Sequence, residues 1–147
     1  MSIGEGTAHE DLRRWFDEMP VMRLLSARLT GVDSGVAEVT LTPAPDELNP
    51  NGAVNGGIIA AVADLTGGFL VMASGPATEY ASTADLAVHY MVAARATPIT
   101  MRARMLRRGR RMCFVHIDVL DADGTLCAVA TGSWALMPDS PHAPLAS

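Results

Sequence analysis

The chain has 147 residues and a formal net charge of −5, with 49% hydrophobic and 18% charged residues. This length fits one domain, and this composition excludes disorder over most of the chain. The acidic balance argues against nucleic acid as the main partner. The polar N-terminal segment lacks the basic start and apolar run of a signal peptide, so we expect a cytoplasmic location.

The first element expected is a short helix over residues 9–19, which Pro20 ends. The spacing i, i+3, i+4, i+7 places four apolar residues on one face of this helix: Leu12, Trp15, Phe16 and Met19. Residues 1–8 are small and polar, and we expect them to be frayed.

Loose alternation over residues 22–32 and 35–42, with Asp33-Ser34 between them, predicts a β-hairpin. Residues 42–57 are rich in Pro, Asn and Gly and form a loop too long for a simple turn. Residues 56–74 are predicted to be the one long helix, because Ala, Ile, Leu and Met dominate them.

Four strands are expected after this helix, over residues 78–92, 98–108, 111–121 and 125–137. Strict alternation in the first of these strands places Ser82 on one face and Thr83 on the other. The segment Asp121-Ala122-Asp123-Gly124 is a strong hairpin signal between the last two strands.

The order of these elements predicts the fold class. One long helix cannot supply the crossovers of a parallel sheet, so we expect an α+β fold with an antiparallel sheet wrapped around one central helix. A single domain covers residues 1–147, with its core at about residues 20–137 and a loose, Pro-rich tail at residues 138–147.

One carboxylate in the predicted central helix has an unusual position. Asp64 is the only charged residue among the 31 between Glu47 and Glu79. An ionised carboxylate in an apolar segment is costly unless partners or water reach it, which indicates a functional role and argues against a membrane span. The alternative is that Asp64 lies on a solvated stripe of the helix or bonds a neighbouring backbone group.

The start of the same helix is predicted to expose backbone amides. Gly56 and Gly57 follow Asn55, and unpaired amides at the positive end of a helix suit a carbonyl oxygen that becomes negative in a transition state. The alternative is a loop that needs positive φ angles. Asn55 and Asp64 are about 13 Å apart along a helix, so one helix does not easily place the helix N-terminus and the carboxylate on one carbonyl. Two antiparallel helices from two subunits could do so. This geometry predicts a dimer with its sites at the interface.

The segment Asn49-Pro-Asn-Gly-Ala-Val-Asn55-Gly-Gly-Ile-Ile-Ala-Ala-Val-Ala-Asp64 resembles a known pattern. It is similar to that of hotdog-fold acyl-CoA thioesterases of the PaaI-like, phenylacetic-acid-degradation type: an Asn, a short loop, His-Gly-Gly, six mostly apolar residues and an Asp. The resemblance covers about residues 20–137. It implies a hotdog fold, hydrolysis of an acyl-CoA to free acid and CoA, and a homo-oligomer, either a dimer or a tetramer of two dimers.

The resemblance also implies roles for individual residues. Asp64 corresponds to the general base or nucleophile of the family. The backbone amide of Gly56, with Gly57 beside it, corresponds to the group that polarises the carbonyl. No metal is expected, and no cofactor is expected apart from the CoA that is part of the substrate.

Three further positions follow from the resemblance. Asn49 corresponds to the residue that places the water or the carboxylate, and Ser82, with Thr83 next to it, completes the site. The His of the family pattern is Asn55 here, which hydrogen-bonds like a neutral imidazole but does not titrate near pH 7. This leaves open a catalytically weak acyl-CoA binding or regulatory protein, and it disfavours a hotdog dehydratase.

All 11 basic residues are Arg, and seven of them lie between residues 95 and 111. Arg recognises phosphate through paired donors, so four of them are candidates for binding the phosphates of CoA: Arg107, Arg108, Arg110 and Arg111. The alternative is that these are solvated strand and turn charges that face nearby acids.

Overall fold

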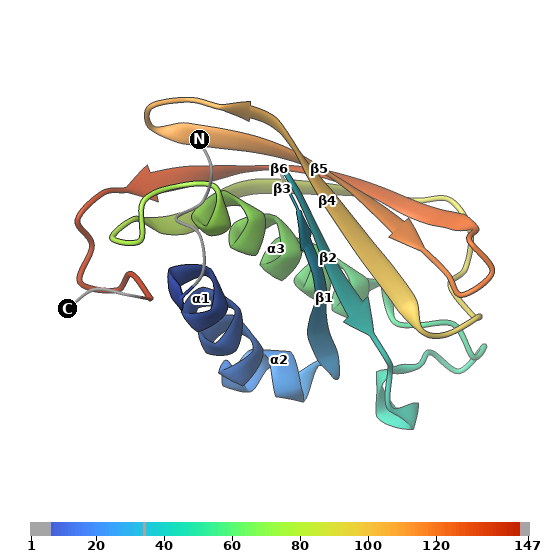
Figure 1. The fold of residues 1–147 in the computed structure, drawn as a ribbon. Helices are drawn as coiled ribbons and strands as arrows, with labels where there is room; N and C mark the ends of the chain where they lie inside the picture. Colours follow the sequence, from blue (N-terminus) through green and yellow to red (C-terminus); the bar gives the residue numbers. More distant parts are fainter. Residues whose placement is uncertain (1–6, 34, 145–147) are drawn as a thin grey trace.

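The structure is a computed structural model that describes residues 7–33 and 35–144. Six strands form one antiparallel sheet in the order β1-β2-β4-β5-β6-β3, which curves around the long helix α3 (Figure 1). The strands are β1 (Ala27–Asp33), β2 (Val36–Leu41), β3 (Tyr80–Tyr90), β4 (Ile99–Arg108), β5 (Met112–Leu120) and β6 (Leu126–Met137). The helices are α1 (Thr7–Glu18), α2 (Pro20–Leu24), the 3-10 turn η1 (Pro45–Glu47) and α3 (Gly56–Ala73). The predicted sheet around one central helix is therefore confirmed.

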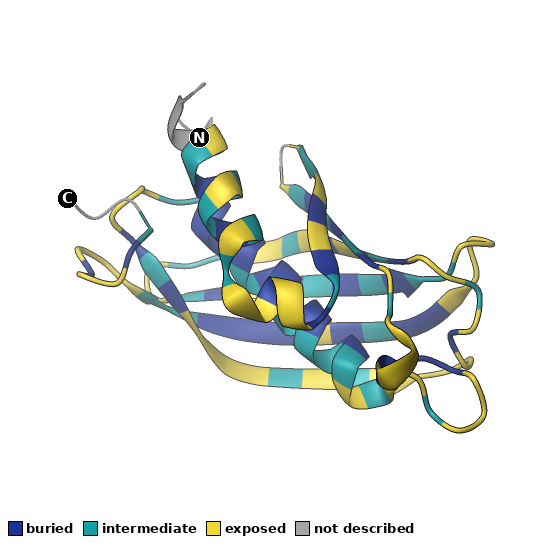
Figure 2. Ribbon diagram, turned by 90° about the horizontal axis from the view of Figure 1, so that it is seen from below, coloured by how far each residue is buried: buried dark blue, intermediate teal, exposed yellow. Residues whose placement is uncertain are grey.

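The core lies between α3 and the concave face of the sheet. Strand register aligns Val39, Met101, Val119 and Ala128 in one row, and all four are fully buried. Burial along α3 increases toward its C-terminal half (Figure 2). The length and composition of α3 would also suit a membrane span, but 56% of it is buried inside the protein, as expected for a core helix.

The predicted hairpin is present, but its first strand is shorter than expected. Residues 20–24 form α2, with Pro20 in the first turn, where proline is tolerated because its missing N–H is not needed. β1 begins only at Ala27, after Ser26 with a φ of 53°. The prediction of a strand from the loose alternation was therefore wrong for residues 22–26.

The two ends of the chain differ from expectation in two respects: Thr7 and Ala8, predicted to be frayed, belong to α1, and the C-terminal tail is partly buried. The helix predicted at residues 9–19 is present as α1, which packs beside the C-terminal half of α3. The tail was predicted to be loose, but Ser140 and Ala143 are buried, and the Ser140 amide donates to the Thr78 carbonyl at 3.0 Å. The segments 1–6 and 145–147, predicted to be frayed and loose, lie outside the described residues.

Candidate active site

The predicted catalytic carboxylate contacts the edge strand of the sheet. Asp64 lies in the middle of α3 and is partly exposed. The Thr83 hydroxyl donates a hydrogen bond to Asp64 Oδ1 at 2.7 Å. Asp64 Oδ2 has no hydrogen-bond partner among the described residues. One oxygen is thus held in place, and the other is available for proton transfer or attack.

The hydroxyl in contact with Asp64 comes from Thr83, whereas the sequence favoured Ser82. Register pairs Thr83 with Trp134 and Ser82 with Ala135, so the two side chains point to opposite faces of the sheet. A bulge directly after Thr83 interrupts the two-residue period that the sequence indicated for the whole strand. The contact with Asp64 is therefore corrected to Thr83, and a catalytic role for Ser82 stays a prediction.

Asp64 and Thr83 form part of the wall of a pocket of about 280 Å³. The rest of the wall is mostly apolar and comes from α1, the joint between α1 and α2, α3, β3 and β6: Trp15, Phe16, Met19, Leu65, Gly68, Phe69, Met72, Tyr80, Ala81, Ser82 and Trp134. The arrangement combines one carboxylate with a mostly apolar cavity, which is typical of a binding site for a mostly apolar ligand.

Trp134 forms part of this wall and is almost fully buried, at 1% exposure. A Cβ at Gly67 would lie 2.3 Å from Trp134 Cη2, and a Cβ at Gly132 would lie 2.7 Å from the same atom. No side chain fits at either distance, so these glycines make the space that the indole fills.

The two asparagines predicted for the site are in direct contact. Asn55 caps α3: its Oδ1 accepts hydrogen bonds from the amides of Gly57 (2.8 Å) and Ile58 (3.4 Å), and its Nδ2 donates to Asn49 Oδ1 (2.9 Å). The cap satisfies amides that a helix start leaves unpaired. The Gly57 amide is therefore occupied, which corrects the prediction that it helps to polarise a carbonyl.

The Gly56 amide remains available at the positive end of α3, with no hydrogen-bond partner among the described residues. The Gly56 carbonyl accepts a hydrogen bond from the Tyr90 hydroxyl, and a Cβ on Gly56 would lie 3.3 Å from the Tyr90 ring. Desolvation raises the pKa of Tyr90, so this hydroxyl stays protonated and remains a donor at neutral pH. Sequence reasoning gave Tyr90 no role, because a tyrosine at a strand end carries no specific signal.

Two residues of the same strand therefore mark the two parts of the site. β3 contacts Asp64 through Thr83 and Gly56 through Tyr90. Gly56 and Asp64 are about 12 Å apart along the axis of α3, so one chain does not bring both to one carbonyl.

Arg108, predicted to bind CoA phosphates, points into the protein. Its guanidinium pairs with Glu79 and donates to the Val71 carbonyl at 3.2 Å, near the C-terminal end of α3. Cations are favourable at this end of a helix, and Glu79 is buried, so the pair is structural. This contact corrects the assignment of Arg108 to CoA.

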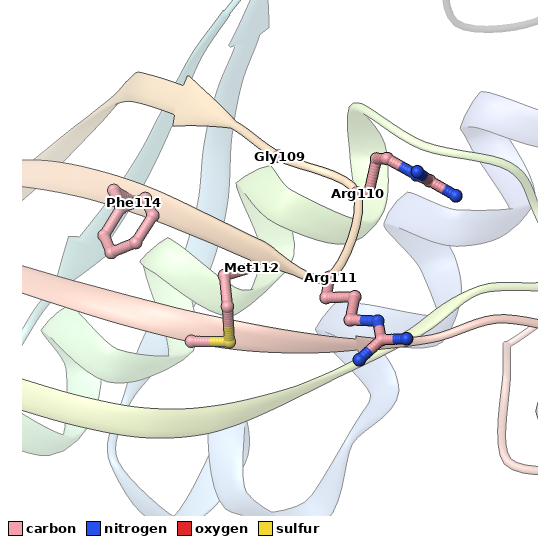
Figure 3. Close-up of a pocket in the computed structure, with 5 residues that line it drawn as sticks. All are labelled: Gly109, Arg110, Arg111, Met112 and Phe114. Atoms are coloured by element: carbon pink, nitrogen blue, oxygen red, sulfur yellow. The ribbon is translucent and has the colours of Figure 1, made fainter.

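The other three candidate arginines remain available. Arg107, Arg110 and Arg111 are exposed, and they form no ion pair within the described part of the chain. Arg110 and Arg111 extend from the turn between β4 and β5, beside an open pocket of about 410 Å³ that Met112 and Phe114 also line (Figure 3). Two exposed guanidinium groups on one turn suit an anionic group.

Thiol and metal chemistry have little support in the described residues. Cys113 and Cys127 are buried free thiols, and desolvation raises the pKa of both, which disfavours the reactive thiolate. Across residues 7–33 and 35–144, no three His, Cys, Asp or Glu side chains form a group that could hold a metal ion.

A comparison with protein families gives the site its context. The model of the Thioesterase superfamily matches residues 51–128, more than half of the chain, which include the α3 cap, Asp64 and Thr83. The chain belongs to this superfamily. In general terms this thioesterase is a hydrolase of thioesters.

Individual relatives agree with this membership. A protein of Saccharolobus solfataricus, provisionally named an esterase, is 28% identical over 117 residues, which cover 80% of this chain and 83% of that protein. A Haemophilus influenzae thioesterase structure has a TM-score of 0.85 at 18% identity and covers 97% of this chain and 99% of its own. The Escherichia coli PaaI protein from the phenylacetic acid degradation operon has a TM-score of 0.79 at 18% identity, with 88% and 93% covered. At these identities the two structures show the hotdog fold.

Proposed function

We propose that this thioesterase hydrolyses acyl-CoA and that Asp64 carries the reaction. The observation that supports this most directly is that Asp64 faces an apolar pocket with one oxygen held by Thr83 and the other unpaired. In one route, Asp64 takes a proton from a water molecule that attacks the thioester carbon. In the other, the carboxylate attacks this carbon and forms an anhydride, which water then hydrolyses. In both routes the C–S bond breaks, and the CoA sulfur leaves as a thiolate and takes up a proton.

The carbonyl oxygen becomes negative during either route and needs a fixed donor. The Gly56 amide fits this role because it is unpaired, lies at a helix N-terminus and needs no change of protonation. Since Gly56 and Asp64 of one chain are too far apart, the donor is Gly56 of a second copy of the chain.

The free edge of the sheet supports this dimer. Strand β3 is an edge strand, most of its residues are exposed, and it contains neither Lys nor Pro, which often protect such edges. Antiparallel pairing of two β3 strands, centred between Leu86 and Ala87, would place Thr83 of one copy opposite Tyr90 of the other. Asp64 of one chain would then lie beside Gly56 of the other.

The CoA moiety carries several phosphate charges, which Arg110 and Arg111 are placed to bind. Both are exposed, and Leu136 on β6 donates its amide to the Arg111 carbonyl. β6 is paired with β3, so the turn lies two strands from the edge at which the proposed sites form. Replacing Arg110 and Arg111 with Ser should raise KM for acyl-CoA more than it lowers kcat. The reason is that the contacts between arginine and phosphate are made equally in the ground state and the transition state.

Mixed dimers test the shared site. Asp64→Asn and Gly56→Val should each be nearly inactive alone, because the first removes the carboxylate from every site and the second blocks the approach to the amide of residue 56 with a branched side chain. In a statistical mixture, half of the dimers contain both variants, and each of these has one intact site. About a quarter of the parental activity should therefore return, measured as release of the CoA thiol.

The outcomes separate the alternatives. No recovery on mixing, with exchange of subunits demonstrated, would contradict a site shared between chains. A folded parent that binds CoA esters saturably but hydrolyses none would favour the binding or regulatory protein that Asn55 left open.

A further inference from the structure

The wall of the pocket beside Asp64 includes a helix that lies outside residues 51–128, which the family model matches. We propose that α1 and the residue that follows it set the upper size of the acyl group, with Trp15 and Met19 as the residues that determine specificity. This inference rests on the proposed function, because hydrolysis at Asp64 places the acyl group in this pocket.

α1 is held firmly enough to serve as a wall. Leu12 and Phe16 are buried, and the Phe16 ring packs on the Phe69 ring of α3 with centroids 4.8 Å apart. At the other side of the helix, Asp17 Oδ1 accepts a hydrogen bond from the Leu29 amide of β1 at 2.8 Å. The helix is thus fixed to both the core helix and the sheet.

The apolar side chains of α1 and of Met19, which follows it, form two pairs with different environments. Leu12 and Phe16 are buried in the core, whereas Trp15 and Met19 are only half-buried and line the pocket. A half-buried Trp and Met that contact a cavity are less constrained than core residues, and they offer a large apolar surface to a ligand. Leu12 and Phe16 therefore hold the chain in place, and this positions Trp15 and Met19 to contact the acyl group.

The composition of the wall favours a compact acyl group. The chain has only 7 aromatic residues, and five of them line this pocket: Trp15, Phe16, Phe69, Tyr80 and Trp134. Flat aromatic side chains offer broad apolar contact surfaces, which suit a ring or a short chain better than a long flexible one.

The volume gives the size limit. A cavity of about 150 Å³ holds benzene, so 280 Å³ has room for about ten carbon atoms, as a substituted ring or a medium chain. The lining residues of α3 extend from Asp64 to Met72, roughly 12 Å along the helix axis. Octanoyl and phenylacetyl groups fit these dimensions, whereas a palmitoyl group does not.

A binding experiment tests the pocket without turnover. Both tryptophans of the chain line it, so intrinsic fluorescence reports on its occupation. Octanoate and phenylacetate should each change the emission of Asp64→Asn saturably. Met19→Phe in the same background should weaken octanoate binding about tenfold by filling the cavity. Leu24→Ala, which removes an exposed apolar side chain of α2 that does not line this pocket, should leave the affinity within about twofold.

A kinetic experiment tests the size limit. For each protein, kcat/KM is measured with octanoyl-CoA and with palmitoyl-CoA. Trp15→Ala should raise the ratio of palmitoyl to octanoyl activity at least about tenfold, and Met19→Phe should lower octanoyl activity. Leu24→Ala should leave the ratio unchanged. Since the two α1 variants change the cavity in opposite directions, a defect in folding does not reproduce both shifts.

The two proposals fail in different ways. Hydrolysis by the parent with an unchanged length ratio in Trp15→Ala and Met19→Phe would overturn the role of α1 and leave the proposed function standing. Saturable, Met19-sensitive binding of octanoate without any hydrolysis would overturn the proposed function and leave the pocket as an acyl site. Absence of both binding and hydrolysis would overturn both.

Discussion

Helix α3 contains two Gly-Gly pairs that serve different physical purposes. At Gly56-Gly57, the missing side chains leave a helix N-terminus open, with one amide unpaired and the other capped by Asn55. At Gly67-Gly68, they make room for the indole of Trp134, which lies 2.3 Å from the place of a Cβ on Gly67. The first pair exposes backbone to a ligand, and the second admits a side chain into the core.

Asp64 lies between the two pairs, and the difference between them explains how one helix serves a hydrolytic site. The second pair and Trp134 build the pocket in which Asp64 lies. The first pair is too distant to serve the same pocket and is proposed to serve that of a second copy. Substitutions should therefore separate three contributions: the chemistry of Asp64, the packing of Trp134 against Gly67, and the polarisation of the substrate carbonyl by Gly56.

The largest effect is expected at Asp64. Asp64→Asn keeps the shape of the side chain and an acceptor for Thr83, so the fold should be retained. It removes the base or nucleophile, and kcat should fall about 10²- to 10⁴-fold. The measurement is CoA thiol release beside a thermal melt, with Asp123→Asn in an exposed turn as a control for the lost charge. Near-parental turnover in folded Asp64→Asn would refute the catalytic assignment.

The second largest effect is expected on stability at Gly67. Gly67→Ala forces the Trp134 indole to move, and overpacking of this kind costs about 1–3 kcal/mol. Gly68→Ala is the matched control, because its Cβ would lie 3.3 Å from Trp134 Nε1 and Ala favours a helix. Thermal unfolding should show a clear loss for the first variant and little change for the second. Equal melting temperatures would mean that Gly67, like Gly56, tolerates a side chain, and would contradict a packing role for Gly67.

The fold could largely be predicted from the sequence because its signals are local. The bounds of α3 follow from an apolar run between Asn55 and Ser74, and the β5–β6 hairpin follows from the Asp-Gly turn, where Gly124 has a φ of 81°. α2 was missed because a helix of five residues that begins with a proline carries too little periodicity to be distinguished from a strand.

The site could be predicted only where one residue carried the signal. Asp64 was identified because it is the lone charge in an apolar segment. Ser82 was favoured over its neighbour Thr83 by the family resemblance, and which of the two adjacent side chains reaches α3 depends on how β3 pairs with β6. The inward turn of Arg108 depends on Glu79, 29 residues away, and could not be derived from the Arg-rich segment.

The third effect concerns polarisation by the Gly56 amide. Gly56→Ala keeps the amide but places a Cβ 3.3 Å from the Tyr90 ring and narrows the approach to the N–H. We expect kcat/KM to fall about tenfold, less than the 10²–10³ that loss of an oxyanion donor costs, with little change in melting temperature because Ala favours a helix. Tyr90→Phe controls for the contact with the Gly56 carbonyl. A stability loss without an activity loss would assign both glycine pairs to packing.

The smallest effect is expected at Asn55. Asn55→Ala removes the cap of α3 and the bond to Asn49, which should cost about 1 kcal/mol of stability. A lost neutral hydrogen bond of about 0.5–1.5 kcal/mol predicts a fall in kcat/KM of about 2- to 13-fold. Asn55→Ser restores a capping oxygen without the amide, so the difference between Ser and Ala isolates the contribution of the cap. An activity loss that Ser fully restores would mean that the contact with Asn49 contributes nothing.

Replacing Asn55 with His tests the view that the fixed Gly56 amide carries the polarisation. Asn55→His loses the short capping oxygen, so α3 should be slightly less stable, and the Gly57 amide should become unpaired. On our proposal, activity stays similar or rises modestly, and the rate profile gains a titration near pH 6–7 from the new imidazole. The competing view holds that the absent His has already silenced the enzyme, and it predicts a gain of orders of magnitude. Assays of the parent, Asn55→Ala and Asn55→His on one good substrate across this pH range distinguish the two. A gain above about 100-fold would show that polarisation by Gly56 alone does not support efficient catalysis.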